Sequence, residues 1–214
     1  MARLAVLPPK TPNFETKIVT NHVATYHWNK IALAAASGHE ESVRDYVQKQ
    51  NGPIDTFIPD CVYFGWKAFE EPNALILAAG HGHVECVRIL VNTNEKSART
   101  PKTRQTALMA AAAACYPEIV QLLLDQAGNK DMRGWTALMY AADRGSPDCC
   151  RMLVRVEAGQ KDETSQSALL LAAIGGHLEA VREIAPSEAK DFGGFVTSII
   201  EDGPIKDEIM KYLV

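Results

Sequence analysis

The feature that most constrains this chain is a block of 20 residues that occurs five times without an internal gap. The blocks are WNKIALAAASGHEESVRDYV (28–47), PNALILAAGHGHVECVRILV (72–91), QTALMAAAAACYPEIVQLLL (105–124), WTALMYAADRGSPDCCRMLV (135–154) and QSALLLAAIGGHLEAVREIA (166–185). Their anchor position holds Gly38, Gly82, Cys115, Gly145 and Gly176, at spacings of 44, 33, 30 and 31 residues. Self-similarity of this period indicates a stacked-repeat fold, in which each unit contacts only its neighbours.

Each block predicts two short helices joined by a turn. Thr106, Thr136 and Ser167 stand where a hydroxyl would cap the first helix, and the anchor glycine is expected to end that helix in a left-handed turn. The second helix begins with prolines or acids and carries an apolar stripe at positions i, i+1 and i+4. That stripe comprises Cys86, Val87 and Leu90, then Ile119, Val120 and Leu123, then Cys149, Cys150 and Leu153, then Ala180, Val181 and Ile184. Arg44, Arg88, Arg151 and Arg182 share a column that we expect to face solvent.

These helix–turn–helix units resemble ankyrin repeats. The fourth copy matches the family motif at Asp131, Gly134, Thr136, Leu138, Ala141, Ala142 and Gly145, and His39, His83 and His177 supply the motif's Gly-His pair elsewhere. The motif's T-P-L-H is replaced by TALM, NALI, TALM and SALL, which is similar to the repeats of diplomonad protist ankyrin proteins. The resemblance covers residues 28–214. It implies an all-α ankyrin-repeat solenoid of stacked helix-turn-helix units with hairpin-like connectors.

The repeats are expected near 28–50, 72–98, 101–130, 131–161 and 162–190, with a terminal cap at 191–214. In that cap, Ile209, Met210 and Leu213 continue the second-helix stripe. Residues 1–27 are interpreted as a leader or partial cap. Residues 51–71 form an aromatic insertion that contains Phe57, Tyr63, Phe64, Trp66 and Phe69. Two interpretations stay open: the insertion covers the open side of the first repeat, or it forms part of a binding surface.

Composition narrows the function classes. A net charge of −4 and a pI near 5.9 give no electrostatic reason to expect nucleic acid or an anionic membrane as partner. No apolar run approaches the roughly 18 residues of a membrane span, so we expect no membrane insertion. Five cysteines without a CxxC pair fit reduced thiols, which favours the cytoplasm, with the cytoskeleton or nucleus as alternatives.

No motif typical of an enzyme or a metal site is present. The sequence His81-Gly-His83-x-x-Cys86 resembles a ligand set, but His83 and Cys86 occupy repeat columns that already explain them. Cys149 and Cys150 are expected in the core, and Cys61 is the thiol most available for reaction. We therefore expect no catalytic residue, no metal, no cofactor and no small-molecule substrate.

The resemblance implies a protein–protein interaction module whose partner contacts the concave face, formed by the connector tips and the exposed ends of the first helices. The partner itself is unknown, and the chain is expected to be a monomer. The candidate contact residues are Trp135, Arg133, Met132, Arg144, Asp143, His81, Lys102, Arg104, Gln105, Glu163, Gln166, Phe192, Phe195 and Trp66. Trp135 is the first candidate, because the scaffold does not require tryptophan in its column.

Two alternatives remain beside this interpretation. The chain could be the regulatory or targeting part of an enzyme complex, or it could bind nucleic acid through the basic connector 96–104, against its acidic overall charge. The connectors also change in charge along the chain, which indicates either electrostatic recognition or ordinary solvated loops. The earlier ones contain Lys96, Arg99, Lys102, Arg104, Lys130 and Arg133. The later ones contain the acids Glu157, Asp162, Glu163, Glu188 and Asp191 against the cations Arg155, Lys161 and Lys190.

Overall fold

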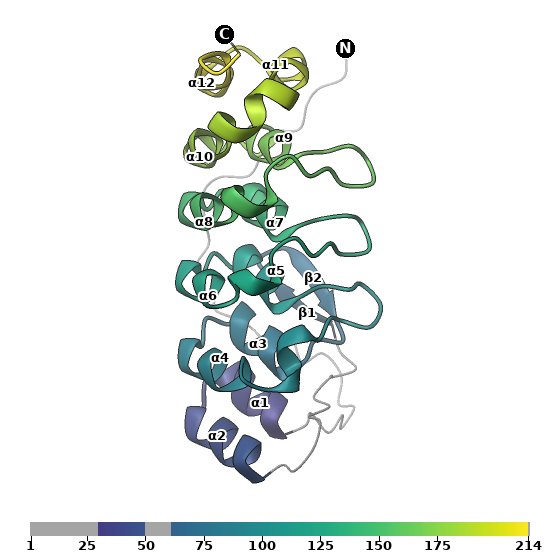
Figure 1. The fold of residues 1–214 in the computed structure, drawn as a ribbon, viewed down its shortest axis with the longest axis vertical. Coiled ribbons are helices and arrows are strands. Elements are labelled where there is room, and N and C mark those ends of the chain that lie inside the picture. The colour runs from purple at the N-terminus through teal and green to yellow at the C-terminus, as the bar shows by residue number, and fades with distance from the viewer. Residues whose placement is uncertain (1–29, 50–60, 214) are drawn as a thin grey trace.

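The computed structural model describes residues 30–49 and 61–213, which form one elongated stack of helix pairs (Figure 1). The predicted leader 1–27, the first residues of block 28–47, and the part of the insertion up to residue 60 lie outside the described residues. Within the described range, the predicted helical solenoid is confirmed. A two-stranded hairpin from the insertion is added to it.

The first helices of the repeats form one row of the stack and the second helices form the other (Figure 1). The inner row comprises α1 (Lys30–Ser37), α3 (Ala74–Gly80), α5 (Ala107–Ala113), α7 (Ala137–Arg144), α9 (Ala168–Ile174) and α11 (Gly194–Ile199). The outer row comprises α2 (Glu40–Lys49), α4 (Val84–Leu90), α6 (Pro117–Leu122), α8 (Pro147–Glu157), α10 (Leu178–Glu188) and α12 (Pro204–Met210). Short turns η1 (Asn94–Ser97), η2 (Leu124–Gln126) and η3 (Ala189–Gly193) follow three of the outer helices.

The predicted helix ends are confirmed. The hydroxyls of Thr106, Thr136 and Ser167 each accept the backbone N–H three residues later, at the start of α5, α7 and α9. The anchor column adopts the left-handed region, with φ of 69° at Gly145 and, without glycine, 63° at Cys115. Because a side chain costs energy in this conformation, the turn geometry is dictated by the repeat rather than by Cys115 itself.

The core lies between the two helix rows. Every member of the predicted stripes of α4, α6, α8 and α10 is buried, including Cys149 and Cys150. The arginine column faces solvent as expected, and it also links successive repeats. Arg88 pairs with Glu118 at 3.2 Å, Arg151 with Glu183 at 2.8 Å and Arg182 with Glu208 at 3.4 Å. Since such exposed pairs contribute little each, the apolar stripes dominate the stacking energy.

A second column of buried polar residues was not expected from the sequence. Glu95, Gln126, Glu157 and Glu188 recur every 31 residues, and their side chains accept backbone N–H groups at the start of the inner helix of the same repeat. Glu157, for example, accepts Leu138 N–H at 2.6 Å and Gly128 N–H at 2.7 Å. Both interpretations of the connector charges, electrostatic recognition and solvated loops, are therefore wrong for Glu157 and Glu188, because both carboxylates are buried and accept backbone N–H groups.

The terminal unit differs partly from its prediction. Ile209 is buried, but Met210 is 50% exposed, so the stripe of the preceding outer helices is not continued at Met210. The physical reason is position: α12 is the last outer helix described and packs on α10 from one side only.

The buried column gives a testable prediction for stability. Replacement Glu157→Gln turns an amide N–H₂ toward one of the two backbone donors, so a buried N–H loses its acceptor. We expect a loss of about 1–3 kcal/mol in unfolding free energy, measured by urea titration. Glu163→Gln, an exposed acid on the next connector, is the matched control and should change stability by less than about 0.5 kcal/mol. Equal effects of the two replacements would contradict the structural role.

The same carboxylate predicts a pH dependence. Burial raises the pKa of Glu157 above its ordinary value of 4.5, although its backbone donors act in the opposite direction. Between the ordinary and the raised pKa, the folded chain binds more protons than the unfolded chain, so stability falls as pH rises. The stability advantage of the natural chain over Glu157→Gln should therefore shrink as pH increases through this window. An advantage that grows with pH would show that the pKa is lowered instead.

Candidate partner-binding surface

Three connectors project from the stack and are called fingers here: residues 98–105, 127–135 and 158–166 (Figure 1). Each is folded by an internal side-chain acceptor. Asp131 Oδ1 accepts the N–H of Arg133 and of Trp135, both at 2.8 Å. Neighbouring fingers are joined directly, because Met132 N–H donates to Thr103 O at 2.9 Å and Glu163 N–H to Arg133 O at 3.1 Å. The fingers are thus ordered before any partner arrives.

The described part of the insertion is an antiparallel hairpin of β1 (Cys61–Phe64) and β2 (Lys67–Glu70). Gly65 and Trp66 form its two-residue turn, and Gly65 has φ 62°, which fits a type II′ turn. Residues directly opposite in the register share a face, so Val62, Phe64, Lys67 and Phe69 form one side of the hairpin. This side faces the protein: Phe64 and Phe69 are buried, while Cys61 and Tyr63 on the other side are exposed.

The hairpin is seated over the inner helices of repeats two to four. The Phe64 ring occupies the space above Gly80, where an added Cβ would lie 2.3 Å from the ring. Phe69 packs against Tyr140 with ring centroids 5.9 Å apart, and Ala68 O accepts a hydrogen bond from Gln105 Nε2 at 2.9 Å. The expectation that the insertion covers the open side of the first repeat is therefore wrong for residues 61–70. Small residues along the inner helices of repeats two to four leave space for the hairpin there.

A buried polar network holds the hairpin to the fingers. The Tyr140 hydroxyl donates to Asp131 Oδ2 at 2.9 Å and accepts from Gln105 Nε2 at 2.8 Å. The Arg133 guanidinium donates to the same hydroxyl at 3.2 Å. Burial, followed by the charge of Asp131, raises the pKa of Tyr140, so its proton stays in place. Gln105 is only 2% exposed, which corrects its prediction as a contact residue: its amide is used inside the molecule.

Trp135, the first candidate for partner contact, is only 7% exposed. Its indole N–H donates to Asp162 Oδ2 of the next finger at 3.0 Å, and its ring packs edge-on against Tyr140. The Lys67 ammonium lies 3.9 Å from its ring centroid. The prediction of Trp135 as an anchor was wrong, because the tryptophan supports the hairpin from below and is covered by it.

At the hairpin tip the structure brings together three predicted residues, Trp66, Asp143 and Arg144. Trp66 Nε1 donates to Asp143 Oδ2 at 2.8 Å, and Lys67 forms an ion pair with the same oxygen at 3.0 Å. The Arg144 guanidinium lies over the Trp66 ring, 4.1 Å from its centroid. Trp66 itself is 57% exposed. This cluster joins the insertion to the fourth repeat.

The remaining candidates fall into two groups. Exposed positions are Lys102, Arg104, Met132, Arg133, Glu163 and Phe195, whereas His81, Gln166 and Phe192 are half-buried. Burial, followed by the nearby His83, lowers the pKa of His81, whose ring lies edge-on to Phe64. Part of the basic connector is already neutralised, since Lys96 pairs with Asp125 at 2.5 Å and Lys102 with Glu71 at 2.7 Å.

The hairpin, and the space above Gly80 that the Phe64 ring fills, were not expected from the sequence. The stretch CVYFGWKAFE does carry a signal, because a glycine-containing dipeptide lies between two short runs that contain the strand-forming residues Val62, Tyr63, Phe64 and Phe69. Ile199, an exposed apolar side chain at the end of α11, was not expected either, whereas Tyr63 was expected only as one of the aromatic residues of the insertion.

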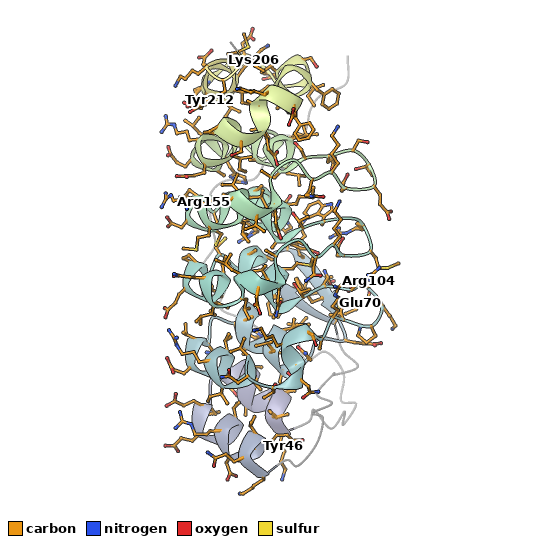
Figure 2. The ribbon with its side chains drawn as sticks, viewed as in Figure 1. Tyr46, Glu70, Arg104, Arg155, Lys206 and Tyr212 are labelled. Atoms are coloured by element: carbon orange, nitrogen blue, oxygen red, sulfur yellow. The ribbon has the colours of Figure 1, made fainter. Side chains whose placement is uncertain are left out.

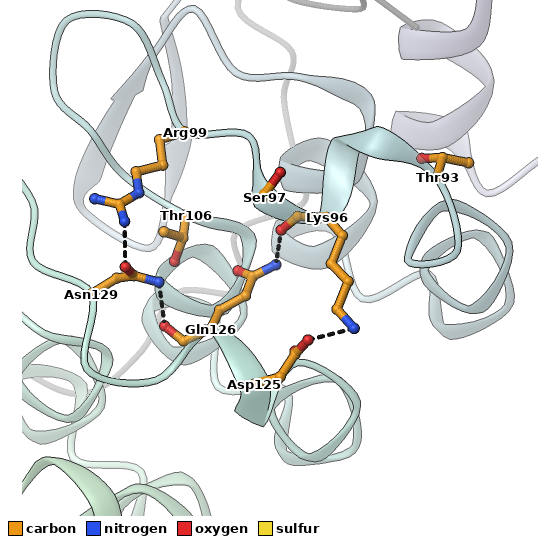
Figure 3. Close-up of a pocket in the computed structure, with 8 residues that line it drawn as sticks. All are labelled: Thr93, Lys96, Ser97, Arg99, Thr106, Asp125, Gln126 and Asn129. Carbon is orange, nitrogen blue, oxygen red and sulfur yellow. Dashed lines mark hydrogen bonds and ion pairs between the residues drawn. The ribbon is translucent and has the colours of Figure 1, made fainter. Parts of the chain in front are cut away.

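A pocket of about 390 Å³ lies beside the first finger, between η1 and η2 (Figure 3). Its polar groups bind one another: Gln126 Nε2 donates to Lys96 O at 2.7 Å, Asn129 Nδ2 donates to Gln126 O at 2.7 Å, and Arg99 bonds to Asn129. The pocket is therefore a seam between two repeats in which Lys96, Arg99, Gln126 and Asn129 already have partners.

The cysteine thiols are poorly suited to reaction, and the acidic side chains are not grouped for metal binding. Burial raises the pKa of Cys149 to about 11 and also raises that of Cys150. Cys61 is exposed as expected, but partial burial and the charge of Glu70 raise its pKa, which disfavours the reactive thiolate. In the described ranges no three His, Cys, Asp or Glu side chains are placed to hold a metal ion. No helix in those ranges is long and apolar enough to cross a bilayer.

Stacked helix pairs with ordered fingers define a repeat scaffold that presents a surface rather than an enclosed site. The chain matches the ankyrin repeats (three copies) over residues 31–133 and 125–193. It belongs to the ankyrin repeat family, whose members are generally protein-interaction modules.

Three curated relatives share this region. The chain is 33% identical over 156 residues to a probable E3 ubiquitin-protein ligase of Oryza sativa subsp. japonica, which covers 67% of this chain and 31% of the relative. It is 30% identical over 120 residues to the ankyrin repeat protein nuc-2 of Neurospora crassa (53% and 11%). It is 23% identical over 159 residues to a leucine-rich repeat serine/threonine-protein kinase of Caenorhabditis elegans (62% and 7%). The chain thus spans less than a third of each relative, and its narrower likeness to diplomonad repeats stays a prediction.

The notch above Gly80 gives a prediction for the hairpin. Gly80→Ala places a methyl group against the Phe64 ring, so the hairpin must shift or leave its seat. We expect a loss of about 1–3 kcal/mol in stability and faster hydrogen exchange in residues 61–70. Gly175→Ala, directly after α9, places a methyl group against His177 and not against the hairpin, and is the control for exchange in 61–70. Unchanged protection in Gly80→Ala would contradict the seating.

Proposed function

We propose that this chain is a scaffold whose protein partner lies along the fingertips and the exposed ends of the inner helices. The observation that carries the proposal is a set of exposed side chains on pre-ordered supports. Met132 is 53% exposed and Phe195 is 61% exposed, and Arg133 and Glu163 flank the hydrogen bond that joins two fingers. Because the backbone beneath is already fixed, binding orders few additional groups.

The hairpin changes which part of the concave face is available. It covers Gln105, Trp135 and Tyr140, so a partner reaches the fingertips and the hairpin's own outer side in place of those residues. Tyr63 and Trp66 on the hairpin are 63% and 57% exposed. Exposed aromatic residues of this kind are enriched among interface hot spots, which supports a partner site that includes the hairpin.

The enzyme-complex alternative has support from the relatives. Two of them are a kinase and a probable ubiquitin ligase by name, and each is far longer than the matched region. Under this alternative, the ankyrin repeats deliver a partner to an attached catalytic domain and perform no chemistry themselves. A coding sequence that joins a catalytic domain to these repeats would support it.

A cytoplasmic location and a monomeric state are also proposals. Three buried cysteines without a disulfide among the described residues fit a reducing compartment. Light scattering of the purified chain would test the monomer.

The exposed fingertip residues Met132 and Arg133 give a testable prediction for partner binding. The double replacement Met132→Ala and Arg133→Ala removes an exposed apolar group and a charge, together with the Arg133 donor to the Tyr140 hydroxyl, while it leaves the backbone bonds between fingers intact. We expect a loss of at least about tenfold in affinity for a partner identified from native lysate, measured by calorimetry. A matched pair on the outer row, Arg155→Ala with Val156→Ala, should leave affinity unchanged. Equal losses from both pairs, with folding preserved, would place the partner elsewhere.

A further inference from the structure

Arg144 is the one charged residue among the described residues with a buried side-chain atom that lacks a hydrogen-bond partner. Its guanidinium is stacked on Trp66, and its Nε is buried without a hydrogen-bond acceptor in the described part of the chain. The neighbouring carboxylate, Asp143, is already bound by Lys67 and by the Trp66 indole. None of the ion pairs among the described residues includes Arg144, so its charge is uncompensated. A polar group left in this state calls for a specific explanation.

The local geometry holds Arg144 in place rather than leaving it free. An added Cβ on Gly65 would lie 3.0 Å from both Cζ and Nε of Arg144, so the hairpin turn closes over the side chain. Stacking on Trp66 further restricts the guanidinium plane. A planar, restrained guanidinium is well suited to bidentate recognition of a carboxylate, because little side-chain freedom is lost on binding.

The inner helices that follow α7 in the stack end in exposed apolar side chains. Ile174 occupies the position of Asp143 in the following repeat and is 61% exposed at the end of α9. Ile199 is 52% exposed at the end of α11, which packs against α9. Trp66 and Arg144 are in contact, and Ile174 and Ile199 are exposed at the ends of the next two inner helices, which pack on α7 in sequence. We call these four residues, one cation and three large apolar groups, the Trp66–Arg144 surface.

We propose that the Trp66–Arg144 surface binds a partner segment that carries a carboxylate beside apolar side chains. The carboxylate pairs with the Arg144 guanidinium, and the apolar side chains pack on Ile174 and the Trp66 ring. The inference rests on the proposed function and deepens it, since it names the chemistry of the bound segment. Charge complementarity favours a carboxylate, and the apolar neighbours favour a peptide over the sugar–phosphate backbone of nucleic acid.

The test uses a phage-displayed library of random 12-residue peptides selected against the full chain. Selected peptides are expected to contain Asp or Glu beside Leu, Ile or Phe. A synthetic peptide from this selection is then labelled, and its dissociation constant is measured by fluorescence anisotropy. Arg144→Gln should weaken binding about tenfold or more, and Ile174→Ser several-fold. A peptide whose acid is replaced by its amide should be equally weak on the natural chain and on Arg144→Gln.

Control variants separate charge, stacking and folding. The control variants Arg155→Gln and Val156→Ser replace an exposed cation and an exposed apolar residue on α8. Arg155 lies on the outer row, across the stack from Arg104 and Glu70 (Figure 2). Both should bind the peptide as the natural chain does. Arg144→Lys retains the charge without the planar fork and should retain part of the affinity. Unchanged urea midpoints for these variants exclude unfolding as the cause of any loss.

Three outcomes would overturn the inference: no enriched peptides, enriched peptides without an acid, or binding unaffected by Arg144→Gln. Peptide binding that is lost in Met132→Ala with Arg133→Ala, yet unaffected by Arg144→Gln, would overturn this inference alone and leave the proposed function standing. A single-stranded oligonucleotide provides one more test. If it competes with the peptide and its binding is lost in Arg144→Gln, the inference is overturned, because the site would then bind phosphate.

Discussion

The described stack of helix pairs depends throughout on the contact between neighbouring repeats. A single helix pair here has helices of six to eleven residues, too short to be stable in water alone. Stability comes when the apolar stripe of one outer helix and the alanine-rich face of one inner helix are covered by the next unit. The buried acceptors at Glu95, Gln126, Glu157 and Glu188 fix how each inner helix begins within that stack. The fingers inherit their spacing from this arrangement, and with it the surface offered to a partner.

The hairpin follows from the same constraint. Inner helices with small side chains pack closely, and the positions that remain uncovered, such as Gly80, leave space on the concave side. Phe64 and Phe69 fill that space, and each contributes about 2 kcal/mol by burial. The hairpin covers Trp135 and Gln105, which contact it from below. Trp66 and Tyr63 of the hairpin are exposed to solvent in their place. The concave face is therefore formed by the repeats and by the hairpin 61–70. An alignment of the repeats shows only the first of these two parts.

The scaffold could be predicted from sequence because its residues recur in register. The caps at Thr106, Thr136 and Ser167, the left-handed turn at Gly145 and the stripe that contains Cys149 and Cys150 are confirmed. The site could be predicted only in part. Trp135 was assigned from its variability, but exposure depends on what covers a residue, and the cover comes from 61–70. Glu157 was interpreted as a charged connector residue. Nothing in a single sequence shows that its carboxylate accepts hydrogen bonds from two backbone N–H groups.

The hairpin also alters how the stack can come apart. In a plain solenoid each unit interacts only with its neighbours, so unfolding can start at an end and proceed one unit at a time. Residues 61–70 contact repeats two, three and four together, through Gly80, Gln105 and Tyr140. These three repeats are consequently bound into one cooperative block, whereas the fifth repeat and the terminal unit retain only nearest-neighbour contacts. The C-terminal end of the stack can then fray and reform while the centre, with its docked hairpin, stays closed.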